Sequence, residues 1–119
     1  MSNDWKERTK RFALDVIGYC SALPGKPVFR VITGQLMRSG TSVGANYRAA
    51  CRSKSKADFI NKLSIVEAEA DESGYWLELL ENLPVNNKLE LGRLKGEASQ
   101  LVAIMIQSKK TARNRPDNS

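Results

Sequence analysis

The chain has 119 residues, of which 41% are hydrophobic and 27% are charged, values that fit one globular domain and exclude a disordered or fibrous protein. Nineteen basic residues outnumber thirteen acidic ones, and the formal net charge of +6 mildly favours polyanionic partners. The start of the chain is charged where a signal peptide is apolar, and no apolar run approaches the roughly 20 residues that span a bilayer, so we expect a cytoplasmic protein with no membrane partner.

The first predicted element is an amphipathic helix over about residues 3–22. Its apolar residues recur at three- and four-residue intervals, and they are Trp5, Phe12, Ala13, Val16, Ile17 and Cys20. Two prolines and a glycine at residues 24–27 end this helix. Cys20 and Cys51 lack Cys-x-x-Cys spacing and the chain has no histidine, so we interpret both as small core residues rather than as a zinc site or a disulfide.

A second helix is predicted over about residues 28–51. Its apolar face consists of Val31, Ile32, Leu36, Val43 and Ala50. Residues 40–44 contain two glycines and β-branched side chains of low helix propensity, so one interpretation is a break in the helix. The other is that these small side chains let a neighbouring helix approach closely, and that tertiary packing stabilises the helix. We favour the second, because no proline or polar cluster marks a loop.

A third helix is predicted over about residues 56–83, after a polar connection in which a serine can cap the helix. Its wide apolar stripe consists of Phe59, Ile60, Leu63, Val66, Ala70, Gly74, Leu77 and Leu80, and a stripe this wide contacts more than one neighbour. A fourth helix follows over about residues 88–110, with a polar, frayed tail over residues 111–119. The sequence therefore predicts an all-α fold, a single antiparallel up-down-up-down four-helix bundle over residues 1–119.

The residues predict no catalytic site, no metal site and no cofactor. Histidine is absent, which removes the commonest general base and metal ligand, and the chain has no phosphate-binding loop motif. Carboxylates at Glu67, Glu69, Asp71 and Glu72 invite comparison with di-iron bundles, but the Glu-x-x-His pair of such sites is missing. We interpret these acids as a solvated face or as partners of basic helices, and a metal-dependent enzyme is the least favoured class.

Charge is unevenly distributed along the chain. Residues 30–62 carry seven basic groups and one acid, whereas residues 63–87 carry six acids and no base, so the two blocks cancel. The surplus of positive charge therefore belongs to the two ends, with +2 in residues 1–29 and +4 in residues 88–119.

Basic residues share one sector of the second helix at 100° per residue and continue just beyond its end. The predicted nucleic-acid-binding residues are Arg30, Arg38, Arg48, Arg52, Lys54 and Lys56. In a continuous helix this row extends roughly 33 Å and follows a phosphate backbone through salt-dependent, sequence-independent contacts. An equally weighted alternative is a solvated face or pairing with the acidic third helix. Tyr47 lies beside the row, and its ring either stacks on bases or packs inside the bundle.

The run QLMRSGTSVGANYRAA at residues 35–50, continued by SKADFINKL at residues 55–63, resembles the bacterial four-helix bundle protein family. This family includes proteins encoded in intervening sequences of large-subunit ribosomal RNA genes and the accessory variability protein of diversity-generating retroelements. The resemblance extends from the first helix to about Ile106. Many members have Asn-Ile-Ala-Glu-Gly where this chain has NYRAA at residues 46–50, so no role of that glutamate is carried over.

The resemblance implies a homopentameric ring of bundles with a basic surface and, in the retroelement branch, a partnership with a reverse transcriptase and its RNA or DNA. Three residues match the shared motif: Arg38 as a phosphate contact or an interface ion pair, and Ser42 and Asn46 as packing and hydrogen-bonding residues. We therefore expect a non-enzymatic nucleic-acid-binding accessory protein that acts as an oligomeric basic scaffold. The alternative is a protein–protein assembly module with no nucleic-acid role.

Overall fold

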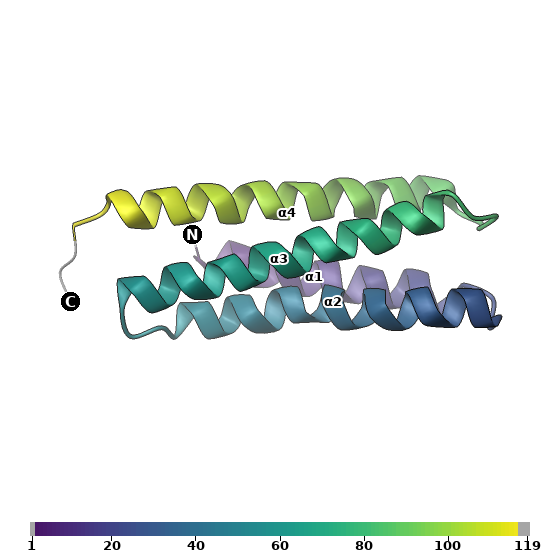
Figure 1. The fold of residues 1–119 in the computed structure, drawn as a ribbon, viewed down its shortest axis with the longest axis horizontal. Coiled ribbons are helices and arrows are strands. Elements are labelled where there is room, and N and C mark those ends of the chain that lie inside the picture. Colours follow the sequence, from purple (N-terminus) through teal and green to yellow (C-terminus); the bar gives the residue numbers. More distant parts are fainter. Residues whose placement is uncertain (1, 117–119) are drawn as a thin grey trace.

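The computed structural model describes residues 2–116, with side chains from residue 4 onward, in four helices: α1 (Ser2–Ser21), α2 (Pro27–Cys51), α3 (Lys56–Glu81) and α4 (Lys88–Asn114). The helices run up-down-up-down, and each packs on its neighbours in the order α1, α2, α3, α4, with α4 also contacting α1 (Figure 1). The bundle measures 52 × 19 × 19 Å. The predicted all-α antiparallel four-helix bundle is confirmed, and residues 2–116 contain no strand.

Local sequence explains where the helices begin. Pro27 lies in the first turn of α2, where a main-chain N–H would have no intrahelical acceptor, so the N–H that proline lacks is not missed. Ser55 caps α3 as predicted, and its hydroxyl accepts a 3.0 Å hydrogen bond from the main-chain N–H of Asp58. Asn87 caps α4 in a left-handed conformation (φ 57°) that asparagine tolerates, and its side chain accepts a hydrogen bond from the N–H of Glu90.

The two glycines in the middle of α2 lie where α1 comes closest. A Cβ atom at Gly40 would lie 3.2 Å from Cγ1 of Val16, and a Cβ atom at Gly44 would lie 3.4 Å from the main-chain carbon and oxygen of Thr9. The helix is continuous from Pro27 to Cys51, so the predicted close approach is confirmed and a break is excluded. Packing against α1 outweighs the low helix propensity of these glycines.

One stripe from each helix forms the core. The largest fully buried side chains are Phe12, Val16, Leu36, Val43, Leu63, Val66, Leu77, Leu80, Leu91, Leu94, Leu101 and Met105. The hydroxyls of Ser39 and Ser73 are also buried and lie 2.8 Å apart between α2 and α3. Val31 and Ile17 are predicted on the apolar faces of their helices, but 68% of Val31 is exposed, and Ile17 is also exposed. Each helix contacts only two neighbours, so the edges of its apolar stripe remain open to solvent.

The C-terminal part of α4 differs from the prediction. The helix continues to Asn114, so a frayed tail from residue 111 is wrong for residues 111–114, and the part after residue 116 lies outside the described residues. Ala112 is buried, and Nζ of Lys56 donates to the main-chain oxygens of Arg113 (3.3 Å) and Arg115 (2.8 Å). These contacts satisfy carbonyls that the end of a helix leaves without intrahelical partners.

Replacing Lys56 by glutamine is expected to loosen the last turn of α4. The free energy of local opening is expected to fall by about 1 kcal/mol, the net value of one hydrogen bond. The amides of residues 112–115 would then exchange with solvent about fivefold faster. Hydrogen exchange followed by mass spectrometry measures this. Lys54→Gln is the control, because Lys54 makes no hydrogen bond to a described residue. Equal exchange in the two variants would mean that Lys56 does not hold the end of α4.

Candidate nucleic-acid interface

The predicted row of cations runs along the whole length of the continuous helix α2, so its members lie at different ends of the bundle. Arg30 lies in the first turn of α2 and Arg48 in its last turn, about 27 Å apart at 1.5 Å per residue. Arg30 therefore lies near the α1–α2 connection. Arg48, Arg52, Lys54 and Lys56 lie together at the other end of the bundle, around the α2–α3 connection (Figure 1).

Arg38, in the middle of α2, is engaged by the acidic face of α3. Its guanidinium pairs with Glu69 at 3.2 Å and with Glu72. Hydrogen bonds from Trp76 Nε1 (2.9 Å) and from Arg38 lower the pKa of the Glu72 carboxyl, and the Glu72 carboxylate in turn raises the pKa of Arg38. This is the pairing with the third helix that was the alternative to phosphate binding, and it neutralises the charge of Arg38.

The other residues that match the shared motif make hydrogen bonds within α2. Ser42 Oγ donates to the main-chain oxygen of Arg38 at 2.8 Å, and Asn46 Nδ2 donates to the main-chain oxygen of Ser42 at 2.8 Å. Tyr47 is buried, so the packed interpretation holds and its ring does not present a face for base stacking. The polar groups of Ser42 and Asn46 are therefore bonded to the main chain of their own helix.

Three cations near the α2–α3 connection are accessible to a ligand: Arg48, Arg52 and Lys54. All three are exposed, and none forms an ion pair with a residue that the structure describes. Besides Arg38, the cations that pair with carboxylates among the described residues are Arg8, Lys62, Arg93, Lys95 and Lys109. Near the α2–α3 connection, these three cations are thus without a carboxylate partner among the described residues.

The topology brings further cations to this end, because α1 and α3 begin there and α2 and α4 end there (Figure 1). In the half of the bundle formed by residues 4–11, 39–68 and 102–116, thirteen basic residues outnumber four acidic ones, for a net charge of +9. In the other half, residues 12–38 and 69–101, six basic residues stand against eight acidic ones, for a net charge of −2. We call the first half the basic end.

The cations that sequence reasoning missed come from α1 and from the end of α4. They are Lys6, Lys10, Arg11, Lys110, Arg113 and Arg115, and none of them pairs with a carboxylate among the described residues. The charge surplus at the two chain ends was the available signal, because an even number of antiparallel helices places both ends of the chain at the same end of the bundle (Figure 1).

A groove lies between α1 and α2 at the basic end. It has a volume of about 430 Å³, and its lining residues are Lys6, Glu7, Lys10, Ala13, Thr41, Gly44, Ala45 and Arg48. The two lysines are four residues apart and share one face of α1. Across from them, Arg48 extends from α2.

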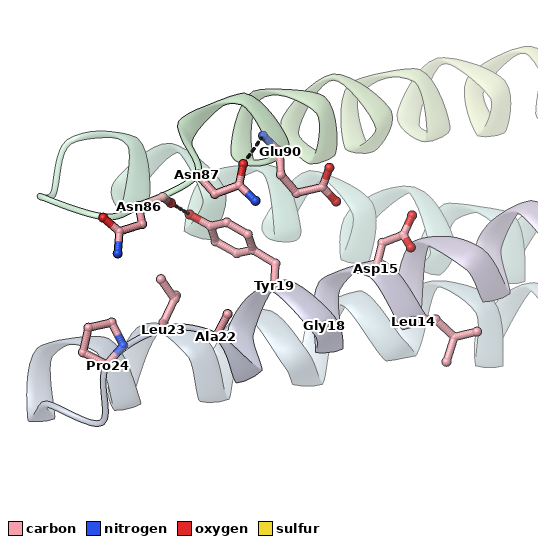
Figure 2. Close-up of a pocket in the computed structure, with 10 residues that line it drawn as sticks. All are labelled: Leu14, Asp15, Gly18, Tyr19, Ala22, Leu23, Pro24, Asn86, Asn87 and Glu90. Carbon is pink, nitrogen blue, oxygen red and sulfur yellow. Dashed lines mark hydrogen bonds between the residues drawn. The ribbon is translucent and has the colours of Figure 1, made fainter.

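The opposite end carries a pocket of different chemistry, of about 350 Å³, between the end of α1 and the α3–α4 connection (Figure 2). The Tyr19 hydroxyl donates to the main-chain oxygen of Asn86 at 3.3 Å, and burial raises the pKa of Tyr19. The carboxylates of Asp15 and Glu90 line this pocket, and both accept hydrogen bonds from Arg93. A phosphate would meet negative charge here, so nucleic acid is not expected at this end.

Among the described residues, no group of three or more His, Cys, Asp or Glu side chains is arranged to hold a metal ion. Cys20 is buried as predicted, and burial raises the pKa of its thiol to about 11, so it is not a nucleophile at neutral pH. Cys51 is partly buried, and both cysteines are free. None of the described helices is long and apolar enough to cross a membrane.

Comparisons with known proteins agree with the family resemblance in the sequence. Residues 2–107 match the family model of the 23S rRNA-intervening sequence protein. The chain is also similar to a protein of unknown function from the S23 ribosomal protein family of Bacteroides thetaiotaomicron VPI-5482, whose crystal structure matches with a TM-score of 0.81. The two are 34% identical, and the match covers 88% of this chain and 97% of that one. The search of curated proteins gave no match.

Proposed function

Because the chain belongs to the 23S rRNA-intervening sequence protein family, we propose that it is a non-enzymatic accessory protein that binds the phosphate backbone of RNA or DNA through its basic end. It acts in the cytoplasm as a homo-oligomer, for which the family resemblance implies five subunits. Its partner is a structured RNA, or a reverse transcriptase with its RNA or DNA.

The observation that carries this proposal is the concentration of unpaired cations at one end. Arg48, Arg52 and Lys54 are exposed and belong to the half of the bundle that has a net charge of +9. Like charges gathered in this way repel one another, and a polyanion relieves that repulsion while releasing its own counterions. Arg30 and Arg38 do not take part, since Arg30 lies at the far end and Arg38 is paired with α3.

The test is binding of the purified protein to structured RNA and to duplex DNA over a salt series. Three phosphate contacts, from Arg48, Arg52 and Lys54, predict that log affinity falls with log salt with a slope of about −2.7 or steeper. Binding that responds little to salt would contradict a phosphate-dominated interface. The absence of measurable binding at about 50 mM salt, where such contacts are strong, would overturn the proposal.

A protein–protein assembly module is the second candidate, favoured by one observation: a cation of α2, Arg38, is satisfied by the carboxylates of Glu69 and Glu72. The same pairing between subunits would use the basic end to join copies of the chain. The oligomeric mass, measured by light scattering over the same salt series, separates the two functions. A stable mass with salt-sensitive RNA binding supports the first, and dissociation in salt without RNA binding supports the second.

A further inference from the structure

The groove between α1 and α2 exists because of how the two helices pack. Gly44 has no side chain, so α2 approaches the main chain of Thr9 within contact distance. The residues near this contact are small, with Ala13, Thr41 and Ala45 beside Gly44, and they leave the space above them unfilled. The longer side chains that line the groove are those of Lys6, Glu7, Lys10 and Arg48, and we call them its rim. The packing that permits the close approach therefore also creates the groove.

The rim of this groove is positively charged without internal compensation. Lys6 and Lys10 of α1 and Arg48 of α2 contribute three cations, against the single carboxylate of Glu7. None of these four groups makes an ion pair with a described residue. Three cations around one groove raise its electrostatic energy, and an anion seated between them lowers it.

We propose that this groove seats the nucleic-acid backbone, with a phosphate held between Lys6 and Lys10 on one side and Arg48 on the other. This inference rests on the proposed function and assigns a place and two further residues to it. The planar guanidinium of Arg48 suits bidentate contact with phosphate oxygens, and the lysine ammonium groups act as point charges. A volume of about 430 Å³ has room for a phosphate with its sugar.

Two other hollows of the bundle do not offer this chemistry. The pocket at the opposite end is lined by Asp15 and Glu90 (Figure 2). The hollow between α3 and α4 has Asp71 and Glu78 against Lys95. Phosphate would be repelled from both, whereas the groove between α1 and α2 carries an excess of two positive charges.

Neutralising the two lysines tests their role. With a fluorescently labelled RNA hairpin as the probe, Lys6→Gln/Lys10→Gln is expected to reduce the magnitude of the salt slope by about one and to weaken binding about eightfold near 0.1 M salt, the loss of the one phosphate contact that the groove holds. The single variant Lys10→Gln has a matched control in Lys26→Gln, which removes the same charge at the far end of the bundle and is expected to bind within about twofold of the wild type.

Filling the groove without changing any charge tests whether a phosphate occupies it. Ala45→Leu leaves every charge in place, and displacement of one phosphate contact is expected to weaken binding about eightfold near 0.1 M salt. Ala103→Leu, at an exposed position of α4, is the matched control and should bind as the wild type does. Circular dichroism verifies that each variant is folded.

The outcomes distinguish this inference from the proposed function. If the wild type binds the hairpin with a steep salt slope, but Ala45→Leu and Lys6→Gln/Lys10→Gln bind as tightly as it does, the groove inference is wrong and the proposed function stands. If Lys10→Gln and Lys26→Gln weaken binding equally, net charge rather than the groove governs affinity, and the inference is also wrong. If the wild type itself does not bind, the proposed function fails and the inference fails with it.

Discussion

Replacing Arg48 and Arg52 together by glutamate is expected to weaken RNA binding by about 100-fold or more near 0.1 M salt. A phosphate contact that contributes about −0.9 to the salt slope contributes about eightfold to affinity at this salt concentration, so two lost contacts account for about 60-fold. The new carboxylates add repulsion of the phosphates. Fluorescence anisotropy with a labelled RNA hairpin measures the change.

The control for this double reversal is Lys26→Glu/Arg30→Glu, which changes the net charge by the same amount at the opposite end of the bundle. Because exposed charges more than about 10 Å apart are largely screened at 0.1 M salt, the control is expected to retain affinity within about threefold. Equal losses in the two variants would show that net charge alone drives binding. A changed oligomeric mass of Arg48→Glu/Arg52→Glu, with no RNA binding by the wild type, would favour the assembly module instead.

Replacing Gly44 by leucine is expected to lower the free energy of unfolding by about 3 kcal/mol, the upper end of the range for overpacked cores. A Cβ atom at this position would lie in van der Waals contact with the main chain of Thr9, at 3.4 Å, so leucine carbons directed beyond it toward α1 would overlap that main chain. The main chain of α1 cannot relieve this overlap by a change of rotamer, as a side chain can. Leucine would therefore push α1 away and loosen the packing of Phe12 and Val16 in the core.

A second glycine of α2 provides the control for this substitution. A Cβ atom at Gly34 meets nothing within 4 Å, so Gly34→Ala should raise the free energy of unfolding by about 1 kcal/mol through helix propensity alone. Urea denaturation followed by circular dichroism measures both variants. A loss below about 1 kcal/mol for Gly44→Leu would mean that α1 and α2 do not need their close approach.

The helices themselves were predictable because their signals are local. Apolar residues repeat at helical spacing, prolines and a glycine mark the α1–α2 connection, and a serine precedes α3. The end of α4 was not predictable in this way. Residues 111–114 look polar in sequence, and the main-chain oxygens of Arg113 and Arg115 accept hydrogen bonds from Lys56, which lies more than fifty residues earlier in the chain.

The candidate site was predictable only in part. A row on one helix face was a valid expectation from 100° per residue, and it contains Arg48 and Arg52. Whether each cation of that row is free depends on the neighbouring helix, and Arg38 is paired because α3 places Glu69 and Glu72 against it. Lys6 and Lys10 belong to α1 and are not part of the row on α2. The row therefore gave no indication of the groove between the two helices.

Local patterns in the chain are enough to predict its four helices, most of their apolar stripes, and a glycine pair suited to close packing. These properties follow from periodicity and propensity, which act between residues a few positions apart. Which charges are neutralised and which gather at one end becomes visible only when the helices are packed together. The physical reason is that ion pairs and grooves form between helices, so they depend on the rotation and register of each helix against its neighbours, and that arrangement is set by packing of the whole core.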